Sequence, residues 1–157
     1  MTTPPSSVKD VDFEVLSEDW TKFRLKPDNA TFRVRLVVAK ILDTGLDKMG
    51  APNFGIGAKN CLSVVVPPDL LKPIGEAPEL TGPIQPEHVK EGTEIDFELI
   101  GQLKWQEYKT STGWLVMLRP EVGRIVKLKY YVKLPEGGLM EPIYWANIQS
   151  VFRVKKA

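Results

Sequence analysis

Apolar and polar residues alternate along several segments of the chain, a period of two that is typical of β-strands with one buried face. Between residues 32 and 38, apolar residues alternate with Arg33 and Arg35. A second apolar run covers residues 54–66, and the intervening segment 43–52 is rich in Gly, Asp and Pro, which favour turns. The pattern predicts a long β-hairpin in the first half of the chain.

The second half repeats this kind of pattern. Residues 93–99 alternate and predict a half-buried strand, and residues 105–110 and 114–118 flank a turn at 111–113. Strands are also expected at 122–134 and 143–154, separated by a Gly-containing loop.

Between the halves, residues 67–86 hold six of the 13 prolines and predict an extended connection. A short helix is expected at 85–92, with Pro86 near its start and Gly92 just after its end.

A shift of 90 residues relates the two predicted hairpins. It places Phe32 on Val122, Phe54 on Tyr144 and Val64 on Val154. We therefore expect an all-β fold built from two long hairpins that a duplication would relate, with half-repeats at about 20–66 and 105–154. A small barrel and a two-sheet sandwich both bury such hairpins, and the sequence leaves this choice open.

The length of 157 residues fits one β domain over residues 12–157, preceded by a polar, proline-containing segment, 1–11, that is predicted to be disordered. That segment does not look like a secretory signal, and no apolar run approaches the roughly 20 residues of a membrane span. The single cysteine cannot form an intrachain disulfide. We expect a cytoplasmic protein with no membrane partner.

The chain has few of the residues that catalytic and metal sites usually require. One histidine, His88, and one cysteine, Cys61, cannot supply a typical zinc set. Cys61 lies within a predicted strand and is expected to be a buried structural thiol, whereas His88 is expected on an exposed helix. The acids at 94, 96 and 98 fit a solvated strand face. We predict no catalytic residues, no metal, no cofactor and no enzymatic activity.

Charge is distributed unevenly along the chain. Residues 1–100 hold 11 Lys and Arg against 16 Asp and Glu, whereas residues 101–157 hold 10 against 4. On the strand at 122–134, one predicted face combines three lysines with a tyrosine, which suits phosphate contacts and base stacking. A surface for single-stranded DNA or RNA is therefore predicted at Lys127, Lys129, Tyr131 and Lys133, with further candidates at Trp105, Trp114, Trp145, Arg153 and Lys155.

A protein-interaction surface is the other interpretation, and the one we favour from sequence. Val37, Ala39 and Ile41 make the second face of the first long strand apolar, and the halves carry opposite charge. These features predict a non-enzymatic assembly module that binds a protein partner or forms a homo-oligomer, with single-strand nucleic-acid binding as the alternative.

Overall fold

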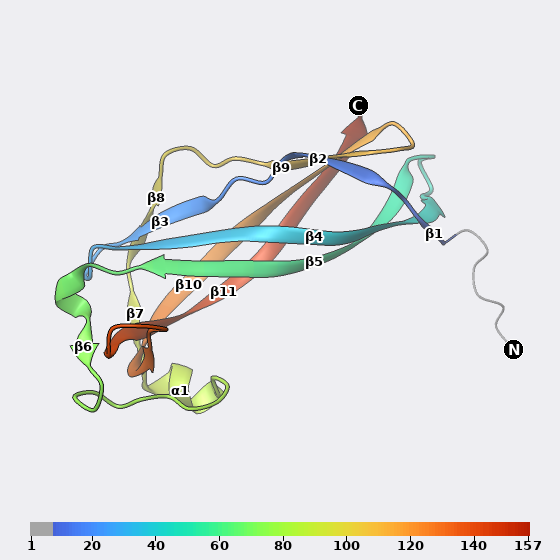
Figure 1. Cartoon of the computed structure of the whole chain (residues 1–157). Coiled ribbons are helices and arrows are strands. Elements are labelled where there is room, and N and C mark those ends of the chain that lie inside the picture. The colour runs from blue at the N-terminus through green and yellow to red at the C-terminus, as the bar shows by residue number, and fades with distance from the viewer. Residues whose placement is uncertain (1–7) are drawn as a thin grey trace, which may run out of the picture.

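The computed structural model describes residues 8–157, which form two antiparallel β-sheets, one short helix and one turn of 3-10 helix (Figure 1). Sheet A contains β1 (Lys9–Asp10), β3 (Thr21–Leu25), β4 (Ala30–Leu46), β5 (Pro52–Val65) and β8 (Phe97–Ile100). Sheet B contains β2 (Phe13–Ser17), β6 (Lys72–Pro73), β7 (Thr93–Ile95), β9 (Gln106–Thr110), β10 (Trp114–Lys133) and β11 (Leu139–Lys156). The 3-10 turn (Pro68–Leu70) and α1 (Pro86–Glu91) lie in the connection between the halves.

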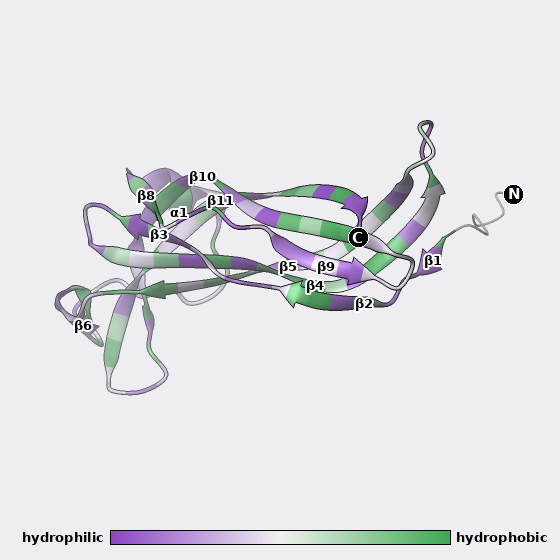
Figure 2. Cartoon of the chain, turned by 90° about the horizontal axis from the view of Figure 1, so that it is seen from above, coloured by the Kyte–Doolittle hydropathy of each residue, from purple (hydrophilic) through white to green (hydrophobic). Residues whose placement is uncertain are grey.

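The predicted all-β class and the two-sheet sandwich are confirmed, and the described strands form no closed barrel. Apolar and polar residues alternate along the long strands, as the sequence pattern requires (Figure 2). No helix within residues 8–157 is long and apolar enough to cross a membrane.

The two predicted segments 114–118 and 122–134 are one continuous strand, β10, which runs through Pro120. β11 pairs with one edge of β10 from Trp114 to Lys133, with irregularities at Gly123 and at residues 128–130. On the other edge, β9 pairs with residues 115–118 and β7 with residues 125–127. Pro120 lies in the gap between them, where its missing N–H leaves no strand partner unsatisfied.

The two halves of the chain follow the same order of strand pairing. In each half, the first short strand pairs with the far part of the long strand, as β1 does with β4 and β7 with β10. The second strand crosses to the other sheet, so that β2 pairs with β9 and β8 with β3. The last three strands form an antiparallel meander, β3–β4–β5 or β9–β10–β11. Each half therefore contributes one strand to the sheet of the other half.

The pairing register corrects the predicted offset of 90 residues. Each long hairpin has a one-residue bulge in its first strand, at Ala39 in β4 and at Gly123 in β10. Aligning these bulges gives an offset of 84 between β4 and β10, so Phe32 corresponds to Val116 and not to Val122, whereas the neighbouring strands β3 and β9 are related by an offset of 85. The second hairpin has six more residues between equivalent pairs, so the offset of 90 holds only for β5 and β11. Under the offset of 84, the sequence Asp-Phe-Glu at 12–14 falls on Asp-Phe-Glu at 96–98.

The core consists of two clusters. When the first half of the chain is aligned with the second, residues of one cluster fall on residues of the other. Each cluster joins residues of both sheets, and each contains a T-shaped aromatic pair. The ring centroids of Phe13 and Tyr108 are 5.9 Å apart in the first cluster, and those of Phe97 and Phe23 are 5.5 Å apart in the second. Packing between the sheets therefore repeats at the two ends of the sandwich.

The buried side chain of Gln106 takes the place of a strand partner on the edge of β4, between the segments that pair with β3 and β1. Gln106 accepts a hydrogen bond from the Leu36 N–H at 2.8 Å and donates to the Leu36 carbonyl at 2.6 Å. It also donates to the Tyr108 hydroxyl at 2.8 Å, and this hydroxyl donates to Glu18 at 2.9 Å. Burial and the Glu18 bond raise the pKa of Tyr108, which keeps the hydroxyl protonated. At the position equivalent to Leu36, sheet B has Pro120, which has no N–H to satisfy.

Two sequence predictions fail near the start of the chain. Residues 1–7 of the predicted disordered segment lie outside the described residues, but Lys9 and Asp10 form β1 and Val11 belongs to the core. In the predicted apolar patch, Val37 and Ala39 are exposed, whereas Ile41 is fully buried. The bulge at Ala39 shifts the alternation by one residue, which turns Ile41 into the core.

Candidate binding surfaces

The predicted cationic surface on β10 is largely neutralised by neighbouring groups. Lys127 Nζ lies 2.9 Å from an Asp28 carboxylate oxygen, and both side chains are mostly buried. Lys133 Nζ lies 3.5 Å from Glu79, and Lys72 Nζ covers the ring of Tyr131 at 5.1 Å from its centroid. These cations therefore hold the Pro-rich connection and the β3–β4 turn against β10, which leaves less charge for a phosphate chain.

Asp28 connects the two sheets. Besides Lys127, its carboxylate accepts a hydrogen bond from the Tyr144 hydroxyl at 2.7 Å. Burial, followed by the Asp28 carboxylate, raises the pKa of Tyr144 and keeps this hydroxyl as a donor. Lys129, by contrast, is exposed and forms no ion pair with residues 8–157.

The remaining predicted aromatic and basic residues are spread over both ends of sheet B. Trp105 and Arg153 come together, with the guanidinium carbon 5.9 Å from the ring centroid. Trp145 lies 5.7 Å from Arg124 and lines a hollow of about 370 Å³ beside α1. Trp114 packs against the first core cluster, and Lys155 is exposed on β11. Of these five predicted residues, the structure therefore brings only Trp105 and Arg153 together.

A second Trp–Arg cluster, which the sequence analysis missed, lies at the equivalent position of sheet A. The Arg33 and Arg35 guanidinium carbons are 4.9 and 4.7 Å from the Trp20 ring centroid. In sheet B, Arg119 corresponds to Arg35 and lies 4.5 Å from the ring of Trp105.

The second guanidinium of each cluster comes from a different strand of the hairpin. In sheet A it belongs to Arg33 on β4, which pairs with Ser63 on β5. In sheet B the equivalent pair is Met117 and Arg153, so the cation lies on β11. Both halves thus place two arginines beside one tryptophan although the second arginine comes from different strands.

The outer face of sheet A is strongly basic around Trp20. Phe32, Val34 and Leu36 point into the core, so the residues between them point outward. Over residues 31–37 of β4 and their partners on β3, β5 and β8, the only outward acid is Glu98. The outward cations, which together with Trp20 we name the cationic face, are Lys22, Arg24, Arg33, Arg35 and Lys59.

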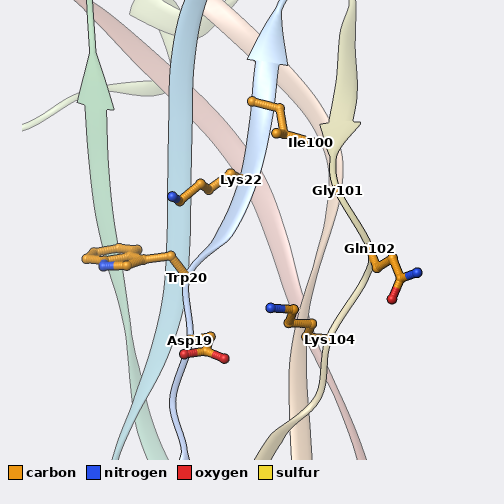
Figure 3. A pocket seen from close by; sticks show the side chains of 7 residues that line it. All are labelled: Asp19, Trp20, Lys22, Ile100, Gly101, Gln102 and Lys104. Carbon is orange, nitrogen blue, oxygen red and sulfur yellow. The ribbon is translucent and has the colours of Figure 1, made fainter.

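A hollow of about 410 Å³ borders this face. Figure 3 shows the side chains that line it. Its walls come from the start of β3 and from the link between β8 and β9. The Trp20 indole extends past β4 toward β5, and Lys22 and Lys104 project beside the hollow (Figure 3). Asp19 is the one acidic side chain in its lining.

Two long strands, β5 and β11, each have an open edge. β5 pairs only with β4, and the outer edge of β11 pairs only with β6 at residues 139–140, within the part of the chain that the structure describes. Residues 142–152 of β11 carry no charge, whereas β5 has Lys59 at the position equivalent to Gln149. Between these edges lies an apolar groove of about 220 Å³, lined by Phe54, Ile56, Ala58, Leu118, Ser150 and Phe152.

Residues with catalytic potential have other surroundings. His88 Nδ1 accepts the Gln85 N–H at 2.9 Å, which caps the start of α1, and the His88 ring packs on Tyr130. Cys61 is half-buried on the outer face of sheet A opposite Arg35, which corrects the expectation of a buried thiol. Within residues 8–157, no three His, Cys, Asp or Glu side chains are arranged to hold a metal ion.

Comparison with known proteins gives no match to a family, to a curated relative or to a solved structure.

Proposed function

We propose that the protein is a non-enzymatic assembly module whose copies associate through the open edge of β11. The observation that carries this proposal is the run of residues 143–152, which contains no charge and no proline, on an edge that has no partner beyond residue 140 in the described structure. An edge strand offers a row of unpaired N–H and C=O groups, and natural proteins usually protect such edges with charges or prolines.

The comparison with β5 supports the choice of β11. The two strands are equivalent in the two halves, but β5 has Lys59 near its middle and glycines at 55 and 57, which weaken strand pairing. β11 has Gln149 where β5 has the lysine, and its charged residues lie only at its ends. Of the two open edges, β11 is therefore the better template for another strand.

Antiparallel pairing of two β11 strands around a twofold axis gives a closed dimer, because the same surface serves both copies. A register centred on Gln149 keeps the end of the partner strand clear of β6. It also places the basic end of each strand, Arg153 to Lys156, opposite the uncharged residues 142–145 of the other strand. Like charges therefore do not meet, and Arg153 faces an indole, that of Trp145.

The test is the molar mass in solution, measured by light scattering across the micromolar range. The native chain is expected to approach twice its mass of 17.7 kDa. A variant with Asn147→Lys and Gln149→Lys places four cations in the middle of the interface and is expected to be a monomer. The control, Asn60→Lys with Leu62→Lys on β5, adds the same charge and is expected to remain dimeric. A native chain that stays monomeric at high micromolar concentration would refute self-association.

The single thiol suits a reducing compartment, and we place this assembly in the cytoplasm.

A further inference from the structure

We infer that the cationic face of sheet A binds single-stranded nucleic acid, with phosphates on its arginines and lysines and bases stacked on the Trp20 cluster. This inference does not rest on the proposed self-association, because β11 belongs to the other sheet. The surface also differs from the one predicted on β10, where Asp28 and Glu79 engage Lys127 and Lys133.

The charge of this face is unusual for its part of the chain. The first 100 residues have a net charge of −5, yet five cations and only one acid point outward here. Arg24 is 3.9 Å from Glu98, whereas the other four cations form no ion pair with residues 8–157. Four uncompensated cations on one sheet face repel one another, and a phosphate chain that binds them relieves the repulsion and releases its counterions.

The arginines are held in a geometry that suits planar, anionic ligands. Arg33 and Arg35 are two residues apart on one strand, a spacing of about 7 Å, close to the repeat of a nucleotide backbone. Their Nε atoms are buried without a hydrogen-bond partner, and an Arg33 terminal nitrogen donates to Ser63 at 2.8 Å. Packing on the Trp20 ring fixes both guanidiniums, whose outer N–H groups can then bind phosphate with little loss of entropy.

The half-buried Trp20 and the stacked guanidiniums supply flat surfaces, and bases stack on both kinds of group. The hollow beside Trp20 extends the face toward Lys104 and has room for a base or a phosphate group (Figure 3). A chain that crosses the sheet from Lys59 past Arg35 and Trp20 to Lys104 therefore meets cations and a stacking platform in succession. A flexible single strand can follow this path, whereas a duplex keeps its bases paired and cannot stack them on the indole.

The equivalent face of sheet B shows what is specific to sheet A. It has the same Trp–Arg cluster, formed by Trp105, Arg119 and Arg153. Its four outward cations, however, share the face with Glu14, Glu107 and Glu121, which leaves a net charge of only +1. We therefore assign nucleic-acid binding to sheet A, and the sheet-B cluster provides matched control variants.

The first experiment measures the fluorescence anisotropy of a labelled oligothymidylate titrated with the full chain at several salt concentrations. Binding is expected to weaken steeply with salt. Arg33→Gln with Arg35→Gln removes two phosphate contacts, and the slope of log affinity against log salt is expected to fall by about 1.4, at about 0.7 per contact on single strands. Arg119→Gln with Lys109→Gln removes two outward cations from the equivalent face of sheet B without changing β11, and is expected to leave the slope unchanged. Equal losses from both double variants, or no binding at low salt, would overturn the inference.

Stacking is tested separately from charge. Trp20→Ala is expected to weaken oligonucleotide binding roughly 5- to 150-fold, the range found when one stacking aromatic is removed, whereas Trp105→Ala has no such effect. Urea denaturation of both variants shows whether each is folded. Heparin serves as a polyanion without bases. If heparin binds as tightly as the oligonucleotide, and Trp20→Ala changes the affinity for neither ligand, the face is a nonspecific polyanion surface and the inference is contradicted. A preference for duplex DNA would contradict it as well.

Cys61 gives a readout on the native protein that needs no substitution in the cationic face. Its thiol is the only one in the chain and lies opposite Arg35 on the adjacent strand. Saturating oligonucleotide is expected to slow alkylation of Cys61 by a maleimide several-fold. The same rate with and without bound oligonucleotide would place the ligand elsewhere and overturn the assignment to sheet A. Cys61 is on β5 and not on β11. Its alkylation therefore reports on nucleic-acid binding, whereas the molar mass reports on dimerisation.

Discussion

Gln106 offers the sharpest test of how the sandwich is stabilised, because one side chain satisfies two backbone groups of the other sheet. Its side chain is almost fully buried and holds the N–H and C=O of Leu36, which lie on the edge of β4 between β3 and β1. Gln106→Leu keeps much of the side-chain volume and removes all of its hydrogen bonds. The substitution leaves little room for a water molecule to replace the amide.

The expected cost follows from the groups left without partners. A buried backbone donor or acceptor that loses its partner costs about 1–3 kcal/mol, so two such groups give about 2–6 kcal/mol. The Tyr108 hydroxyl loses one donor but still bonds to Glu18, and its contribution is smaller. Since domains are typically stable by about 5–15 kcal/mol, Gln106→Leu is expected to remove a large share of the free energy of unfolding.

Thr21 is the matched control, because it occupies the position equivalent to Gln106 and is also buried. Pro120, the counterpart of Leu36, has no N–H that needs a partner. Thr21→Val is therefore expected to change the free energy of unfolding by only about 1 kcal/mol. Urea denaturation followed by tryptophan fluorescence gives both values, with similar m-values if the denatured states are alike. Equal effects of the two substitutions would refute the argument that Gln106 is needed to satisfy Leu36.

Three further predictions concern stability and are measured in the same way. Asp28→Ala removes the shared partner of Lys127 and Tyr144 and is expected to cost about 2–3 kcal/mol. Lys133→Ala breaks a more exposed ion pair and is expected to cost at most about 1 kcal/mol. A cost equal to that of Asp28→Ala would contradict the argument that the more buried pair contributes more to stability. Gly92→Ala would place its Cβ 2.7 Å from the backbone oxygen of Lys127, so a loss of more than about 1 kcal/mol is expected, and a neutral result would show that α1 can move away from β10.

Much of the fold could be predicted because strand alternation depends only on local sequence. Both long hairpins, the short helix at 86–91 and the proline-rich connection lie where the pattern predicted them. A bulge has no comparable local signal, and the one at Ala39 was enough to turn Ile41 from the surface into the core. The offset between the halves was predicted wrongly for the same reason, since bulges and unequal hairpin arms change the count.

The surfaces were harder to predict than the strands, because charge pairing depends on contacts between distant segments. Lys127 is neutralised by Asp28, which lies 99 positions earlier in the chain. The cations at 22, 33 and 59 looked like isolated residues in an acidic half and form one face only because β3, β4 and β5 lie side by side. The alternation of Arg33 and Arg35 with core residues was visible from the start, but their common indole was not.

The exchange of β2 and β8 between the sheets has a consequence for the continuity of the chain. Neither half contains all the strands of its own sheet, so a fragment that ends before α1 lacks β8, and the remaining fragment lacks β2. Each fragment is thus an incomplete sheet whose missing strand is carried by the other. Two fragments divided within the exposed residues 81–85 are expected to be poorly folded when separate and to complement each other when mixed. The two halves thus resemble two subunits that exchange a strand and are joined by a linker. This linker is a suitable position at which to divide the chain for a split reporter.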